Sequence, residues 1–179
     1  MKYEIRLSGT GGQGLVLAGI ILGEAAAIHE NFYALQRQSY GPEARGGASR
    51  SDVIISDEEI DYIVIDEPDI LLAMSQEAYD KYASKVKKGG ILLIDTSLVC
   101  ANSLDRDVRF FSIDFTKSAR SLFNTRIVAN IIALGTIIGV LGIISENSVK
   151  KVLQERIPPK LLSINLRAFE QGIAFSKGE

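Results

Sequence analysis

The chain has 179 residues, long enough to bury roughly 70% of its unfolded surface around a core without disulfide or metal support. Its 20 Lys and Arg nearly balance 22 Asp and Glu, and the net charge of −2 disfavours a nucleic-acid partner. Apolar residues make up 46% of the sequence, which excludes a disordered chain. The single cysteine, Cys100, excludes an internal disulfide and a four-thiolate iron–sulfur or zinc site within this chain.

Two segments of the sequence indicate in which cellular compartment the protein lies. Charges in residues 1–6 interrupt the apolar core that a secretory signal would need, so the cytoplasm is the expected compartment. Residues 127–144 carry no charged side chain and would span roughly 27 Å as a helix, the lower margin for crossing a membrane. The run also holds Asn130, Thr136 and three glycines. We therefore expect a buried helix in the core or at an interface, and no membrane contact.

Short apolar runs and helical periods follow one another along the chain. Strands are expected at 3–7, 32–36, 48–56, 70–74, 91–94 and 108–113. Helices are expected at 15–28, 77–86, 124–144, 145–156 and 160–175, with Pro158-Pro159 separating the last two. This order predicts an α/β fold: a single three-layer α/β/α sandwich over residues 1–179, with a mostly parallel, Rossmann-like sheet and C-terminal helices.

The strongest local signal is a glycine-rich segment between the first expected strand and helix. It fits the spacing G-x-G-x-x-G, which brings backbone N–H groups close to a ligand phosphate at a helix N-terminus. A dinucleotide site would also need an acidic residue near 36–38, where the sequence has Gln-Arg-Gln, so a nicotinamide cofactor is disfavoured. Another anionic ligand, a partner loop, and a turn that serves only packing remain open. The candidate residues are Gly9, Gly11, Gly12, Gln13 and Gly14.

The second candidate segment, residues 39–47, contains little to bury. Pro42 can open a helical turn, and Arg45 beside two glycines offers a guanidinium fork and bare amides for a phosphate or carboxylate. A surface turn with a Glu43–Arg45 charge pair fits the same residues. The candidates here are Tyr40, Glu43, Arg45, Gly46 and Gly47.

Together the two segments resemble the gamma subunit of 2-oxoacid:ferredoxin oxidoreductases. The sequence reads G-T-G-G-Q-G at 9–14, Q-S-Y-G-P-E-A-R-G-G at 38–47 and I-I-S-D at 54–57. The likeness covers essentially the whole chain, including 73–82, 88–90 and Asn130 within 127–135. Residues 11–24 and 75–82 are most similar to the 2-oxoglutarate branch.

The resemblance implies a hetero-oligomeric complex that oxidatively decarboxylates a 2-oxoacid, joins the acyl group to coenzyme A (CoA) and passes two electrons to ferredoxin. It implies alpha, beta and ferredoxin-like delta subunits as partners, and thiamine diphosphate, Mg and iron–sulfur clusters held by those other chains. This chain would then bind no cofactor alone, supply no catalytic residue or metal ligand, and be inactive by itself. It would pack on the thiamine diphosphate subunits and help form the CoA side of the site, with the glycine segment and Arg45 facing phosphate.

Two alternatives stay open: a stand-alone Rossmann-like nucleotide-binding protein, and a non-catalytic assembly module that only braces a catalytic partner. The other candidate residues are weaker. His29 is expected to end a helix, Cys100 to be a buried or half-buried thiol, and Asp95 to sit at a strand end where ligands gather. The acids around Pro68 are expected to form a solvated loop rather than a metal site.

Overall fold

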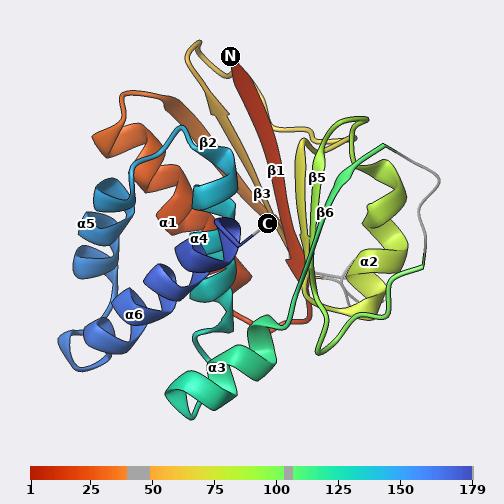
Figure 1. Cartoon of the computed structure of the whole chain (residues 1–179). Helices are drawn as coiled ribbons and strands as arrows, with labels where there is room; N and C mark the ends of the chain where they lie inside the picture. The colour runs from red at the N-terminus through yellow and green to blue at the C-terminus, as the bar shows by residue number, and fades with distance from the viewer. Residues whose placement is uncertain (40–48, 103–106, 179) are drawn as a thin grey trace.

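The computed structural model describes residues 1–39, 49–102 and 107–178, which pack as helices on both faces of one sheet (Figure 1). The strands are β1 (Lys2–Gly9), β2 (Tyr33–Ser39), β3 (Ser49–Ser56), β4 (Ile70–Ala73), β5 (Ile91–Asp95) and β6 (Arg109–Ile113). The helices are α1 (Leu15–Glu24), α2 (Gln76–Tyr82), α3 (Phe115–Phe123), α4 (Ala129–Leu141), α5 (Glu146–Arg156) and α6 (Pro159–Ser176). A π-helical turn (Ala25–His29) follows α1, and a 3₁₀ turn (Ala83–Lys85) follows α2.

The strands lie in the order β2-β3-β1-β4-β5-β6. The pairs β1–β4, β4–β5 and β5–β6 are parallel, whereas β3 runs antiparallel to both β1 and β2. Only residues 40–48 join β2 to β3, too few for the crossover that a parallel pair needs. The expected mostly parallel α/β sheet is confirmed, with β3 as the reversed strand that separates β2 from β1.

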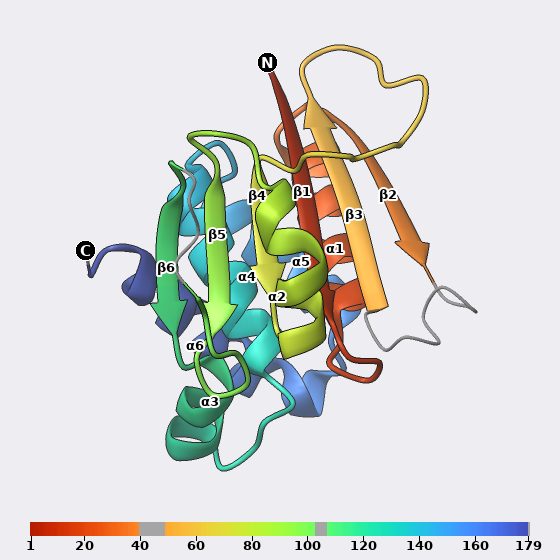
Figure 2. The same cartoon turned by 90° about the vertical axis from the view of Figure 1, so that its right-hand side faces the viewer.

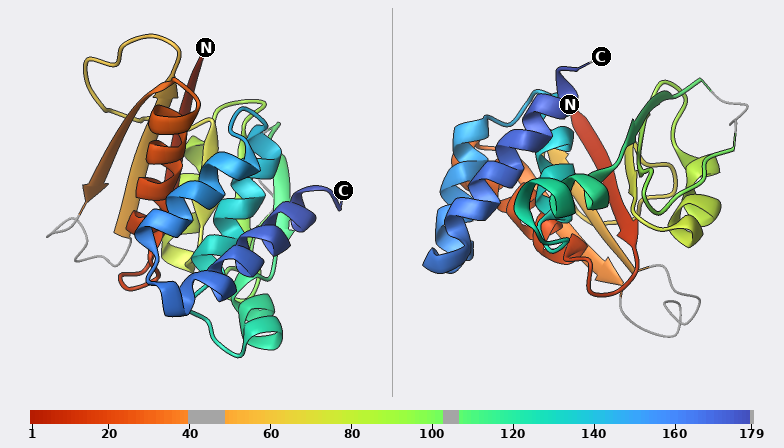
Figure 3. Two further views of the ribbon diagram at one scale, coloured as in Figure 1. Left: turned by 90° about the vertical axis from the view of Figure 1, so that its left-hand side faces the viewer. Right: turned by 60° about the horizontal axis from the view of Figure 1, so that its bottom comes forward.

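The two faces of the sheet are covered unequally. Figure 3 shows α1, α4, α5 and α6 over one face, and Figure 2 shows the short helix α2 over the other. All four residues of β4 are buried, as expected of a central strand that is covered on both sides. The expected three layers are therefore present, with most of the apolar core on the side of α4.

Most of the charge-free run at 127–144 forms α4 (Ala129–Leu141), which is buried along nearly its whole length. It contacts α6 so closely that a Cβ added at Gly135 would lie 2.2 Å from the carbonyl oxygen of Phe169. The Thr136 hydroxyl donates to the carbonyl of Gly172 on α6 at 3.0 Å. The expected buried helix is confirmed, and no described helix has both the length and the apolar character needed to cross a membrane.

The expected start of this helix at residue 124 is wrong. Residues 115–123 form a separate helix, α3, which ends at Asn124 in the left-handed conformation (φ 54°). Its buried apolar side chains, Phe115 and Ala119, are one turn apart, but the helix has only nine residues and most of those between its two ends are polar. Such a short amphipathic segment is a weak periodic signal beside the long apolar run that follows it.

We predict opposite effects for two alanine substitutions of helical glycines. Gly135→Ala places a methyl group against the α6 backbone and should lower the free energy of unfolding by about 1–3 kcal/mol or more. Gly23→Ala, where an added Cβ meets no atom within 4 Å, should raise it by roughly 0.5–1 kcal/mol. Urea unfolding followed by circular dichroism measures both. Equal stability of the two variants would contradict the close α4–α6 contact.

Glu30 joins the end of the π-helical turn to the start of α5. Its Oε1 accepts hydrogen bonds from the Ser148 hydroxyl at 2.7 Å and from the Ser145 backbone N–H at 2.8 Å. The bond from Ser148, followed by those from Ser145, holds the pKa of Glu30 below its ordinary value of 4.5. The ionised carboxylate therefore stabilises the folded chain.

This lowered pKa predicts a pH-dependent effect of Glu30→Gln. The stabilisation by Glu30 is fully present above the pKa that Glu30 has in the unfolded chain, and it is lost as the pH falls through the lower folded pKa. Wild type should therefore exceed Glu30→Gln in stability at neutral pH, and the difference should shrink below pH of about 4.5. Denaturant unfolding at a series of pH values measures it. The exposed Glu155→Gln serves as control and should show no such trend.

Candidate functional site

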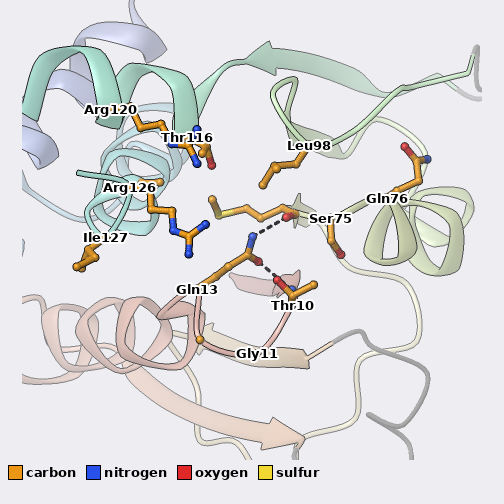
Figure 4. Close-up of a pocket in the computed structure, with 13 residues that line it drawn as sticks. Thr10, Gly11, Gln13, Ser75, Gln76, Leu98, Thr116, Arg120, Arg126 and Ile127 are labelled. Atoms are coloured by element: carbon orange, nitrogen blue, oxygen red, sulfur yellow. Dashed lines mark hydrogen bonds between the residues drawn. The ribbon is translucent and has the colours of Figure 1, made fainter. Parts of the chain in front are cut away.

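A pocket of about 540 Å³ opens at the edge of the sheet where β1, β4 and β5 end. This size is usual for a small-molecule site, and the carboxyl ends of parallel strands are where ligands of α/β proteins gather. Figure 4 shows the lining side chains converging from the loops after these strands and from the region between α3 and α4. The lining residues are Thr10, Gly11, Gly12, Gln13, Met74, Ser75, Gln76, Leu98, Thr116, Arg120, Arg126, Ile127 and Ala129.

Hydrogen bonds hold the glycine-rich loop in place. Gln13 accepts from the backbone N–H of Thr10 through Oε1 and donates to the carbonyl of Met74 through Nε2, each at 2.8 Å (Figure 4). On the other side, Nδ2 of Asn130 on α4 donates to the carbonyl of Gly14 at 3.0 Å. The loop is thereby tied both to the end of β4 and to the start of α4.

The glycines of the motif divide into two groups. Gly9 and Gly14 serve packing. A Cβ added at Gly9 would lie 2.1 Å from Gln13 Oε1, and one added at Gly14 would lie 2.5 Å from Asn130 Nδ2. Gly14 also has a φ of 76°, which other residues rarely adopt. Gly11 and Gly12 face open space and line the pocket. Gly9 and Gly14 thus fit the interpretation that the motif serves packing, and Gly11 and Gly12 have the space that a ligand would need.

Two arginines that the sequence analysis did not single out line the same pocket. Arg120 belongs to α3 and Arg126 to the turn before α4; in Figure 4 Arg126 points toward Gln13, and Arg120 lies beside Thr116 on the opposite side of the pocket. Neither forms an ion pair within the described parts of the chain, and the described lining contains no acidic side chain. The sequence analysis missed both arginines because it did not predict helix α3. Without that helix, nothing in the sequence placed Arg120 and Arg126 near the glycine loop.

Helix ends add to the positive charge of the pocket. α1 begins directly after the glycine loop, Thr116 lies in the first turn of α3, and Ala129 begins α4. The N-terminal end of a helix carries partial positive charge and unpaired N–H groups, which favour anions. The start of α3 is already occupied by Asp95, which accepts from the Thr116 N–H, so the positive charge of the pocket comes chiefly from the two arginines and the starts of α1 and α4.

Asp95 ends β5 as expected but does not line the pocket. It is fully buried, and its Oδ2 accepts from the backbone N–H of Thr116 at 3.1 Å and from the Thr116 hydroxyl at 2.5 Å. Its Oδ1 accepts from the backbone N–H of Ser97 at 3.0 Å. Asp95 thus holds the start of α3 and, through that helix, the position of Arg120.

The remaining candidates have different outcomes. Tyr40, Glu43, Arg45, Gly46 and Gly47 lie outside the described residues. His29 ends the π-helical turn, as expected of a helix-end residue. The expectation of a buried thiol is wrong, because Cys100 is exposed on a loop whose backbone is held by the Gln76 side chain. Among the described residues, no three His, Cys, Asp or Glu gather in an arrangement that could hold a metal ion.

The geometry also argues against a dinucleotide site. Such a site needs the end of the second strand beside the glycine loop, but here β3 lies between β1 and β2. Arg37, the one residue suited to an NADP phosphate, instead donates from Nη1 to the carbonyl of Ile63 at 3.5 Å. Arg37 is therefore not among the residues that line the pocket, whereas Arg120 and Arg126 are.

The fold and pocket define an α/β protein with an arginine-lined pocket at the carboxyl ends of its strands, without the neighbouring second strand of dinucleotide enzymes. The chain belongs to the pyruvate ferredoxin/flavodoxin oxidoreductase family, whose model matches residues 4–175. It is 48% identical to the 2-oxoglutarate synthase subunit KorC of Methanocaldococcus jannaschii, over 99% of this chain and 95% of that protein. It is 42% identical to KorC of Methanothermobacter marburgensis, over 96% of this chain and 95% of that protein. The resemblance seen in the two motifs is confirmed.

Solved structures agree with this membership. The gamma subunit of a keto/oxoacid ferredoxin oxidoreductase from Geobacter sulfurreducens superposes with a TM-score of 0.89 at 42% identity, covering 99% of both chains. The 2-oxoglutarate:ferredoxin oxidoreductase of Magnetococcus marinus superposes with a TM-score of 0.87 at 26% identity. This second match covers 99% of our chain and 31% of that longer chain, whose structure contains 2-oxoglutarate, coenzyme A and succinyl-CoA.

The bonds made by Gln13 predict a loosened loop in Gln13→Ala. The variant loses one hydrogen bond to Thr10 and one to Met74, each worth about 1 kcal/mol. Hydrogen–deuterium exchange of the amides at 10–13 should therefore become roughly tenfold faster, while exchange in β5 stays unchanged. Gln154→Ala, on the exposed surface of α5, is the matched control. Unchanged exchange at 10–13 in Gln13→Ala would show that the bonds do not hold the loop.

Proposed function

We propose that this chain is the gamma subunit of a complex that oxidatively decarboxylates 2-oxoglutarate to its acyl-CoA and passes two electrons to ferredoxin. The choice of 2-oxoglutarate among 2-oxoacids rests on the KorC relatives, at 42% to 48% identity over nearly the whole chain. In this proposal residues 1–179 act as one domain that packs on the thiamine diphosphate subunits. The expected compartment remains the cytoplasm.

The proposed role rests on one observation: the pocket is lined by two arginines, and no acidic side chain lies among its described lining residues. Coenzyme A bears a diphosphate and a 3′-phosphate, so its nucleotide end needs several cationic contacts. We assign Arg120 and Arg126 to these phosphates, because a guanidinium fork pairs with phosphate oxygens in two-point contacts. The backbone at 11–13 would approach the same phosphates from the opposite wall of the pocket.

The segment at 39–47 enters the proposal as a second contact. Arg45, with Gly46 and Gly47, would bind a CoA phosphate or an acidic group of a partner subunit, and Tyr40 and Glu43 would contact the same partner. The glycine loop would likewise contact either a CoA phosphate or a partner subunit. Both follow from residue chemistry and from the family resemblance.

The cofactors of the complex belong to other chains in this proposal. A four-thiolate iron–sulfur cluster does not fit a sequence with one cysteine. We therefore assign thiamine diphosphate, Mg and the clusters to the alpha, beta and delta subunits, and we expect the isolated gamma chain to be inactive. What this chain's residues do is bind and orient the acyl acceptor beside the catalytic pair.

The pocket arginines are tested in the assembled complex by steady-state kinetics. Arg126→Ala should raise the KM for CoA roughly ten- to a hundredfold, the usual loss for a charge-assisted contact of about 1.5–3 kcal/mol. Arg120→Ala should act in the same direction, and Arg126→Lys should recover part of the effect because it keeps charge but not the fork. The KM for 2-oxoglutarate should stay nearly unchanged. Arg109→Ala, at the far end of β6 from the pocket, is the control.

The same variants separate the alternatives. Loss of the subunit from the complex on gel filtration, with normal CoA kinetics in the remaining fraction, would favour the assembly module. Tight binding of NAD(P) or ATP by the isolated chain would favour a stand-alone nucleotide-binding protein. Arg45→Ala extends the comparison: a raised KM for CoA assigns Arg45 to phosphate, and weakened assembly assigns it to a subunit contact.

A further inference from the structure

The connection between β3 and β4, residues 57–69, has an unusual charge distribution. Seven of its thirteen residues are Asp or Glu, and it contains no Lys or Arg, although the whole chain carries a net charge of only −2. We call this segment the acidic loop. Because β3 runs against the other strands, the loop lies at the opposite edge of the sheet from the pocket (Figure 2).

The acidic loop is anchored to the sheet. The Nη2 atom of Arg6 on β1 donates to the carbonyl of Ile65 at 2.7 Å, and Nη1 of Arg37 on β2 donates to the carbonyl of Ile63 at 3.5 Å. Arg6 is itself buried and bonded through two nitrogens to Asp52 on β3. The returning part of the loop therefore lies across β2, β3 and β1 on the face that also carries α2 (Figure 2).

Apolar side chains remain uncovered around this anchored segment. Tyr62 and Val64 of the loop are 73% and 53% exposed. Side chains alternate along a strand, so Tyr33 and Leu35 of β2 share the face of Arg37, over which Ile63 lies. They are 51% and 38% exposed. These four residues, which we call the β2 patch, form an apolar centre at the edge of the sheet beside the acidic loop.

Some acids of the acidic loop are paired within the chain, and three others are exposed without an ion pair among the described residues. Asp57 pairs with the N-terminal ammonium group, and Asp69 pairs with Lys87. Glu58, Glu59 and Asp61 are exposed and form no ion pair within the described residues. Aromatic anchors beside uncompensated charges are the composition of an interface whose partner brings the opposite charge.

This charge decides between classes of partner. Nucleic acid and anionic lipid would be repelled by the acidic loop. A two-fold contact with a second copy of this chain would bring two acidic loops into one interface, since such a contact uses the same patch on both copies. A protein surface that is apolar at its centre and ringed by lysine and arginine fits both features of the patch.

We propose that the β2 patch and the acidic loop dock a partner subunit that presents such a basic-rimmed apolar surface. The inference rests on the proposed function, because the partner is taken to be another subunit of the same complex. A partner docked beside the acidic loop would leave the pocket at the opposite ends of the strands uncovered. Arg120 and Arg126 in that pocket could then face coenzyme A. The subunit would then be held in the complex through the β2 patch and the acidic loop, and it would bind the acyl acceptor in the pocket.

The test measures binding of the purified full chain to the rest of the complex prepared without it, by biolayer interferometry at low and high ionic strength. Glu59→Lys/Asp61→Lys should slow association about tenfold at low salt and weaken its salt dependence, as rim charges do. Tyr62→Ala should speed dissociation about tenfold by removing an aromatic anchor. Glu155→Lys on α5 and Leu161→Ala on α6 are the matched charge and apolar controls, and both should bind like wild type.

The outcomes separate this inference from the proposed function. If wild type joins the complex and both loop variants bind as it does, the docking surface is refuted while the proposed function stands. If wild type does not join the complex, the proposed function fails and the docking inference fails with it. If light scattering instead shows that wild type self-associates and that Tyr62→Ala abolishes this, the occupant is a second copy and our proposal is wrong.

Discussion

Helix α4 has no polar face, and the helical layer of the protein is arranged to cover it. Its close contact with α6 depends on Gly135 and Gly172, at which added Cβ atoms would meet the opposing backbone. α1 and α3 contact α4 as well, and the sheet lies beneath it. Because α4 is fixed on every side, its N-terminal end is also fixed, and this end forms one wall of the pocket. The requirement to bury one helix thus determines where the pocket can form.

The pocket is built by buried polar groups that do not themselves line it. Asn130 reaches from α4 to the carbonyl of Gly14, and Asp95 reaches from β5 to the start of α3. Each joins segments that are far apart in the sequence. Such bonds preorganise the pocket, so a ligand need not supply the free energy to order it.

Opposite charges occupy opposite edges of the sheet. The edge at the ends of β1, β4 and β5 carries Arg120, Arg126 and the starts of three helices, whereas the other edge carries the acidic loop. The small net charge conceals this separation, because it sums the 20 basic and 22 acidic side chains of the whole chain. A subunit with such a polarity has one side suited to an anionic ligand and another suited to a basic protein surface.

The sequence by itself determined the class of fold, the glycine loop and the family, since each depends on local patterns: short apolar strands, the spacing of Gly9, Gly11 and Gly14, and the second motif. It also predicted that most of the run 127–144 is buried, because an uncharged run has no polar face to expose. The tertiary structure alone decided that β3 runs antiparallel between β1 and β2, and that Arg120 and Arg126 line the same pocket as the glycine loop. Strand neighbours and side-chain convergence come from contacts between distant segments, which no local period encodes.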